Sequence, residues 1–148
     1  MPTLVEQIKA SVREAMKAKN KGRLGTLRFI QSEFKRVEVD ERIEIDDTRA
    51  LVILDKMLKQ RRDSAEQYGN AGREELEAQE LFEIAVISEF LPEPLSEADI
   101  DELIKAAIAD SGASGMQAMG AVMASIKPQV QGRADMAEVS KRVKALLA

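Results

Sequence analysis

The sequence predicts an all-α fold, in which an N-terminal bundle of about four helices is followed by a three-helix C-terminal tail. Apolar residues recur every three or four positions in nearly every segment, which is the period of one helix face. Aromatic residues form only 3% of the 148 residues. The core must therefore consist mainly of aliphatic side chains and methionine, a composition that favours packing of helices on helices.

The first two helices are predicted from a cap, a stop signal and an apolar stripe. A capping box of Thr3 and Glu6 opens the first helix, and Gly22 is its predicted stop. The second helix is expected over about residues 23–39. Its predicted buried stripe consists of Leu24, Leu27, Ile30, Phe34 and Val37.

A long third helix and a fourth helix complete the predicted N-terminal bundle. Asp46 is the expected N-cap of the third helix, and a turn is expected at residues 69–72. The fourth helix is expected over about residues 73–90. Glu83 and Glu89 are predicted on its exposed face, so no carboxylate is expected in apolar surroundings that would raise its pKa.

Pro92 and Pro94 mark the predicted boundary between a domain of residues 1–91 and a domain of residues 92–148, because each proline disfavours helix at the residue before it. Three helices are predicted in the tail. A capping box of Ser96 and Asp99 opens the first, which is expected to stop at Gly112. The second is predicted from an apolar stripe over about residues 116–127 that ends before Pro128, and the third from a cap of Asp135 and Glu138.

Cysteine and histidine are both absent from the chain. Disulfides, thiolate metal sites, cysteine nucleophiles and histidine general bases are therefore excluded, and neither a cofactor nor a resident metal is expected. No stretch has the uncharged length of a membrane-spanning helix. The first ten residues include Glu6 and Lys9, which is unlike a signal peptide, so a cytoplasmic protein without a membrane partner is expected.

A basic segment lies in the first two predicted helices. Nine basic and two acidic residues lie between Lys9 and Arg36. The cations that the helical period places on outer faces are Lys9, Arg13, Lys17, Arg28 and Lys35. They form either a phosphate-binding face or a solvated surface balanced by the acidic runs at residues 38–47 and 74–83.

Arg61 lies on the apolar side of the third predicted helix, near Leu58 and Ala65. This position favours a structural role over contact with a ligand. We expect Arg61 to extend past the apolar stripe or to pair with an acid of the fourth helix, either Glu80 or Glu83.

Three groups of residues resemble the YqeY-like proteins of the GatB/YqeY family. They are KQRRDS at 59–64 with AGR at 71–73, LP at 91–92 with LSE at 95–97, and GAVM at 120–123 with GRAD at 132–135. The resemblance spans almost the whole chain. The sequence departs from the family pattern at Phe90, where the family has tyrosine, and at Pro94, where it has glutamine.

The resemblance implies that the tail is similar to the tail module of the B subunit of glutamine-dependent aspartyl/glutamyl-tRNA amidotransferases, which contacts tRNA. The family label of carbon-nitrogen ligase with glutamine as amido-N-donor would then describe a relative, since no catalytic constellation is found in this chain. The tail cations expected to contact RNA are Arg133, Lys141, Arg142, Lys144 and Lys127. Favourable interaction with the helix dipole is an equally good explanation for the three cations of the last helix.

The first expected function is a non-catalytic module that binds tRNA or charged tRNA, with the tail as the main contact surface. The alternative is a protein-interaction adaptor that uses an apolar groove between helices. A third reading, a carboxylate-dependent enzyme, has no specific residues to support it. The four methionines at positions 116, 119, 123 and 136 could line a partner groove, although their helical spacing favours the core.

Overall fold

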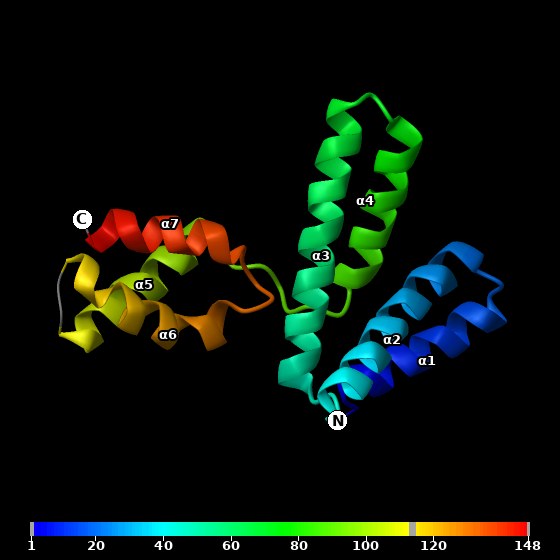
Figure 1. Cartoon of the computed structure of the whole chain (residues 1–148), viewed down its shortest axis with the longest axis horizontal. Coiled ribbons are helices and arrows are strands. Elements are labelled where there is room, and N and C mark those ends of the chain that lie inside the picture. The colour runs from blue at the N-terminus through cyan, green and yellow to red at the C-terminus, as the bar shows by residue number, and fades with distance from the viewer. Residues whose placement is uncertain (1, 113–114, 148) are drawn as a thin grey trace. The chain divides into compact units, whose positions relative to one another are not determined.

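The computed structural model describes residues 2–112 and 115–147, and within these ranges it is all-α, as predicted (Figure 1). The described residues form seven α-helices and one short 3₁₀ turn, Met116–Ala118. The helices are α1 (Leu4–Lys17), α2 (Lys21–Glu41), α3 (Asp47–Asn70), α4 (Glu74–Ser88), α5 (Glu97–Ser111), α6 (Met119–Val130) and α7 (Met136–Leu147). The chain divides into two compact units, Met1–Leu91 and Pro92–Ala148.

The first unit consists of two antiparallel helix pairs, α1 with α2 and α3 with α4 (Figure 1). Helix α2 packs against all three of the other helices. Leu27 and Ile30 of α2, Leu54 of α3 and Ile87 of α4 are fully buried in one apolar core together with Ile8 of α1. The predicted stripe of α2 is confirmed at Leu27, Ile30, Phe34 and Val37, which are buried, and at Leu24, which packs against the core.

The helix starts in this unit follow the predicted caps, with one correction. The capping box of Thr3 and Glu6 is present, and Asp46 accepts a hydrogen bond from the amide of Arg49. The predicted stop at Gly22 is wrong. The chain reverses earlier, where Lys19 has a positive φ of 55° and Asn20 caps α2 by accepting the amide of Arg23. The asparagine cap takes over because it satisfies an amide that a stop at Gly22 would leave unpaired.

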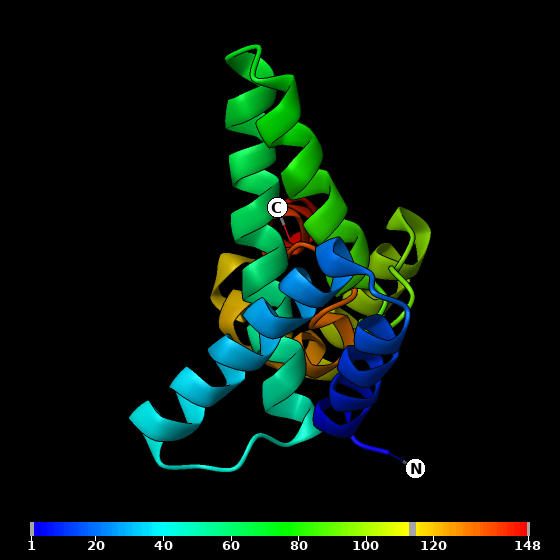
Figure 2. The ribbon, with the colours of Figure 1, turned by 90° about the vertical axis from the view of Figure 1, so that its right-hand side faces the viewer.

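The end of the α3–α4 hairpin extends beyond the α1–α2 pair (Figure 2). No residue from position 66 to position 82 is buried. Gly69 allows the carboxylate of Glu77 to approach its Cα closely, since a Cβ at this position would lie 2.1 Å from Oε2 of Glu77. The two helices at this end are therefore held mainly by one another.

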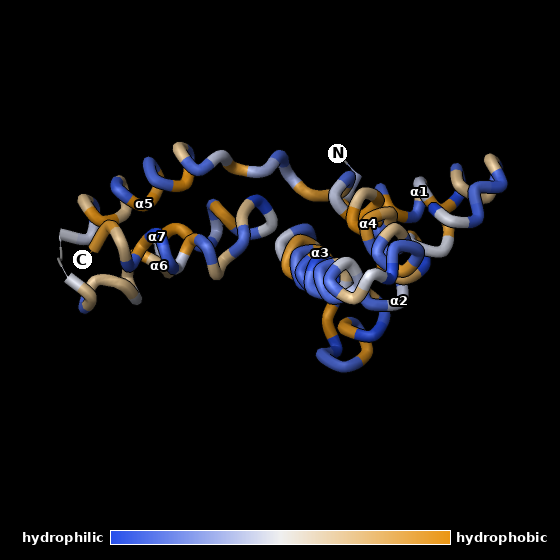
Figure 3. The backbone as a smooth tube through the Cα atoms, turned by 90° about the horizontal axis from the view of Figure 1, so that it is seen from above, coloured by the Kyte–Doolittle hydropathy of each residue, from blue (hydrophilic) through white to orange (hydrophobic). Residues whose placement is uncertain are grey.

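The second unit is formed by α5, α6 and α7 around its own apolar core. Ile104, Val122, Ile126 and Val143 are fully buried there, and the colours along the tube in Figure 3 alternate between hydrophobic and hydrophilic as amphipathic helices require. The capping box of Ser96 and Asp99 and the left-handed cap at Gly112 are present as predicted. Asp135 accepts a hydrogen bond from the amide of Ala137 at 2.9 Å, as a cap of α7 would.

The sixth helix differs from its prediction at both ends. It begins at Met119, after the 3₁₀ turn, and continues through Pro128 to Val130. A proline in the last turn removes a single helical hydrogen bond, that of its own nitrogen. Burial of Val130 in the core offsets this loss, so the helix does not end at Lys127.

Candidate nucleic-acid interface

The exposed face of α2 is basic. Its exposed positions between residues 21 and 39 include four cations, Lys21, Arg28, Lys35 and Arg36, and no acid. The acids in this stretch, Glu33 and Glu38, are half-buried. Lys21, Arg28 and Lys35 follow one another at intervals of about two helical turns, so the helix turns all three to the same side.

Three exposed cations of α1 add to this surface. Lys9, Arg13 and Lys17 recur every fourth residue and are all exposed, as predicted. We name the six exposed cations of these two helices the α1–α2 basic surface: Lys9, Arg13, Lys17, Lys21, Arg28 and Lys35. Within the described residues, none of the six forms an ion pair.

A groove between α1 and α2 brings two of the predicted residues together. Lys9 and Lys35 line it from opposite helices, together with Gln31 and Glu38. Ile8 and Phe34, which are buried, also line it. Two ammonium groups and an amide against one carboxylate leave the groove with an excess of donors that suits an anionic oxygen ligand.

The tail cations are more strongly engaged with their own chain. Arg142 makes a two-pronged pair with Asp101 of α5, with Nε–Oδ1 at 2.8 Å and Nη2–Oδ2 at 2.7 Å. The hydrogen bond from Arg142 lowers the pKa of the Asp101 carboxyl group. The Arg133 Nε donates to the carbonyl oxygen of Glu93 at 3.0 Å.

Lys141 lies 3.6 Å from Glu138, and both side chains are exposed, so this pair is weak. Lys127 and Lys144 are exposed and, within the ranges that the structure describes, have no ion-pair partner. Of the five predicted tail residues, three thus have an internal partner. The predicted secondary face offers more unpaired charge than the predicted main contact surface.

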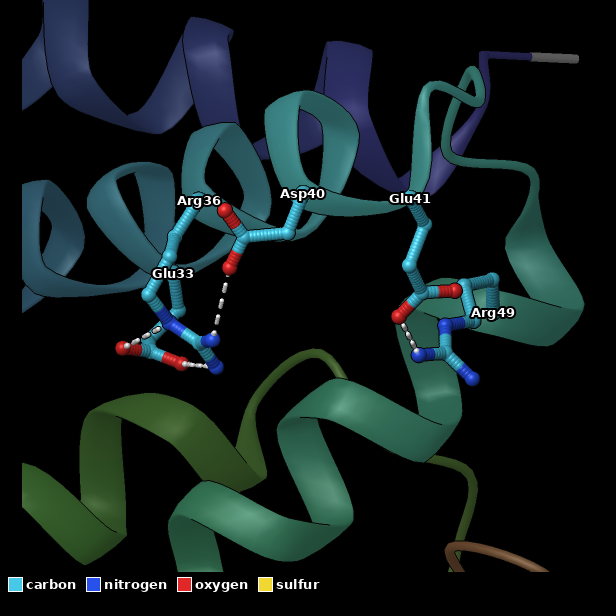
Figure 4. Close-up of polar contacts among 5 residues, drawn as sticks. All are labelled: Glu33, Arg36, Asp40, Glu41 and Arg49. Carbon is cyan, nitrogen blue, oxygen red and sulfur yellow. Dashed lines mark hydrogen bonds and ion pairs between the residues drawn. The ribbon is translucent and has the colours of Figure 1, made fainter.

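A second charged cluster lies between the C-terminal half of α2 and the start of α3 (Figure 4). Arg36 lies 3.0 Å from Glu33 and 3.3 Å from Asp40, while Arg49 of α3 pairs with Glu41. The hydrogen bond from Arg36 lowers the pKa of Glu33. These charges neutralise one another, so Arg36 does not count as a free cation of the α2 face.

The predicted pairing of Arg61 with an acid of the fourth helix is confirmed. The Nε of Arg61 lies 3.4 Å from Oε2 of Glu83, and the two side chains are only 16% and 10% exposed. Nη1 of Arg61 donates to the carbonyl oxygen of Met57 at 3.4 Å. The Cζ atom of the same guanidinium group lies 5.8 Å from the ring centroid of Phe29.

Two expectations about the acids of α4 need correction. Glu83 was expected on the exposed face, but it is buried because Arg61 supplies a counter-charge inside the helix pair. Burial raises the pKa of Glu80, and the charge of Glu83 raises it further, so one carboxyl group does have a raised pKa. Glu89 is exposed as expected and pairs with Arg23.

Sequence reasoning missed Phe29. The one signal that could have indicated it is its position outside the apolar stripe of α2, directly after Arg28. The methionine stripe of the tail divides between surface and core, since Met116 is exposed whereas Met119, Met123 and Met136 pack against the core. Within residues 2–112 and 115–147, no cluster of acidic side chains is arranged to hold a metal ion, and no helix is long and apolar enough to cross a membrane.

These features define a class of all-helical protein with two helical units, ion pairs between its helices and a set of exposed, unpaired cations. The chain belongs to the YqeY-like protein family, whose model matches residues 5–147. It is 29% identical over 147 residues to altered inheritance of mitochondria protein 41, a mitochondrial protein of Pyrenophora tritici-repentis. The matched residues cover 97% of this chain and 81% of the relative. An uncharacterised protein of Schizosaccharomyces pombe is 29% identical over 96 residues, 65% of this chain and 78% of that protein.

Proposed function

We propose that this protein is a non-catalytic module that binds tRNA or another structured RNA. One observation carries the proposal: six exposed cations on α1 and α2, none of which has an ion-pair partner within the described residues. Lysine and arginine side chains that face water without a counter-charge suit the phosphate backbone of a nucleic acid. The similarity of the tail to a tRNA-contacting module supports RNA as the polyanion.

The same observation supports the α1–α2 basic surface, instead of the tail, as the main contact. The tail arginines already use donors on Asp101 and on the Glu93 carbonyl oxygen, so fewer of their five N–H groups remain for an RNA phosphate. The cations of α1 and α2 give up only water. Lys9, Arg13 and Lys17 are spaced along α1 at intervals of about 6 Å, so an RNA backbone can contact several of them at once.

Two variants with equal changes of charge test this proposal. The first replaces Lys9, Arg28 and Lys35 by glutamine, and the second replaces Lys127, Lys141 and Lys144. Neither set includes Arg142, whose loss would also unpair Asp101. Binding of labelled tRNA is measured by fluorescence anisotropy over a series of salt concentrations, and circular dichroism verifies that each variant remains folded.

We expect the first variant to lower the magnitude of the slope of log K against log salt by roughly 2 to 3, since each lost phosphate contact lowers it by about 0.7 to 0.9. The second variant should change the slope by less than about 1. Equal losses in both variants would indicate generic attraction without a defined interface. A larger loss in the tail variant would assign the interface to the tail, and the absence of any salt-dependent binding by the native protein would refute RNA binding.

A protein-interaction adaptor is the second candidate, and exposed apolar side chains of α4 support it. Leu76, Leu81 and Phe82 are each more than 40% exposed. Binding through such side chains would resist salt, because apolar contacts are not screened. A partner that co-purifies at high salt with the native protein but not with Leu81→Lys would favour the adaptor over the RNA-binding module.

We also propose a cytoplasmic location, which the absence of cysteine allows because no disulfide has to form. The mitochondrial relative makes this proposal worth testing directly. A fluorescent protein fused to the C-terminus of the complete natural protein should give a diffuse cytoplasmic signal, and a signal confined to an organelle would refute the proposal.

A further inference from the structure

Phe29 combines an exposed ring with a fixed cation behind it. The residue is 53% exposed on α2, whereas Phe34 of the same helix is buried. The guanidinium group of Arg61 covers one side of the ring at 5.8 Å. More than half of the residue remains exposed, which leaves ring surface accessible to a ligand.

Arg61 is itself held in place from two directions. Glu83 of α4 lies 3.4 Å from its Nε, and Nη1 donates to the carbonyl oxygen of Met57. The cation–π contact adds to these restraints, so the ring of Phe29 rests against a guanidinium group that is anchored to both α3 and α4. The structure thus presents a flat, supported aromatic surface on a basic helix.

The neighbours of Phe29 indicate what this surface suits. A single exposed apolar side chain is ordinary by itself. Arg28 and Lys21 are exposed on the same helix, roughly 80° to 100° around its axis from Phe29. The acid one turn from Phe29, Glu33, is paired with Arg36. Cations near an exposed aromatic ring match a ligand that is anionic and also carries flat apolar groups, and nucleotides have both properties.

We infer that Phe29, supported by Arg61, is a stacking platform for an unpaired base of the bound RNA. This inference rests on the proposed RNA-binding function and narrows its substrate class to RNA with unpaired nucleotides, as found in loops and single-stranded ends. Bases in a continuous duplex are stacked on one another and expose no face to the ring. Arg28 and Lys21 bind the phosphates on either side of the stacked base.

The test uses two RNA probes, a single-stranded oligonucleotide and the same strand in a full duplex, with three variants of Phe29 and its surroundings. Phe29→Ala removes the platform, Phe29→Tyr keeps an aromatic ring, and Val39→Ala is the matched control, since Val39 is 61% exposed on the same helix. Both positions are exposed, so the fold should be retained in all three variants, and circular dichroism verifies this.

We expect Phe29→Ala to weaken binding of the single-stranded probe by roughly 5-fold to 100-fold, which corresponds to the loss of one base stack. The slope against salt should not change, because no charge is lost. Phe29→Tyr should bind as tightly as the native protein, and Val39→Ala should have no effect. Binding of the duplex should be the same in all four proteins.

Two results would overturn the platform while leaving the proposed function intact. They are a Phe29→Ala variant that binds both probes as the native protein does, and one that loses affinity for both probes equally. If Phe29→Ala leaves RNA binding unchanged but disrupts association with a protein, the ring is a protein contact and the inference is wrong. If the native protein binds tRNA but not the single-stranded probe, the platform is wrong and the proposed function stands; if it also fails to bind tRNA in a salt-dependent manner, the proposed function itself fails.

Discussion

Loss of Arg61 alone should destabilise the protein more than the joint loss of Arg61 and Glu83. Two unit charges 3.4 Å apart attract by about 5 kcal/mol at an effective dielectric constant of about 20, but desolvation of both groups offsets much of this attraction. Arg61→Met leaves the carboxylate of Glu83 buried near Glu80 without its counter-charge. We expect the free energy of unfolding to fall by about 3 kcal/mol.

The double variant, Arg61→Met with Glu83→Leu, removes both members of the buried pair, so neither is left without its partner. We expect it to lose less than about 1 kcal/mol, and the coupling energy from the double-mutant cycle should be at least about 1 kcal/mol. Urea denaturation followed by circular dichroism measures all four proteins of the cycle. If the two single losses simply add up to the double loss, the ion pair has no energetic role and the reasoning is refuted.

Two further predictions follow from the carboxyl groups with shifted pKa values. Burial raises the pKa of Glu80, so its contribution to stability is present below the unfolded value of about 4.3 and is lost as the pH rises through the folded pKa. Glu80→Gln should therefore raise the urea midpoint at neutral pH but not in acid, and an unchanged midpoint at neutral pH would contradict this. Arg142 lowers the pKa of Asp101, so the contribution of this group is present above about 3.9 and is lost as the pH falls through the folded pKa. Asp101→Asn should lower the midpoint at neutral pH, with the difference disappearing in acid, and a difference that persists in acid would indicate another cause.

The helices of this protein could be predicted because their signals are local. Thr3, Asp46 and Ser96 cap helices through hydrogen bonds that span three residues, and a local pattern contains all the information needed. The end of α1 and the course of α6 were harder to predict, because two local signals compete at each place. Between α1 and α2, the cap formed by Asn20 prevails over the stop expected at Gly22. In α6, burial of Val130 outweighs the hydrogen bond lost at Pro128.

The candidate interface was less predictable because it depends on partners that are distant in sequence. The exposure of Lys9 and Lys35 followed from helical periodicity. The engagement of Arg142 with Asp101 joins residues 41 positions apart, and no sequence pattern indicated it. The ring of Phe29 acquires its support only when α3 brings Arg61 to α2, so its role was visible only in three dimensions.

The end of the α3–α4 hairpin has a consequence for the motions of the molecule. Between residues 66 and 82 the two helices bury no side chain, so opening of this end exposes little apolar surface and costs little free energy. Backbone amides there should exchange with deuterium much faster than those at Leu54 or Ile87, which are fully buried. The hairpin should therefore open and close locally from its end toward Arg61 and Glu83, while the core below them remains protected.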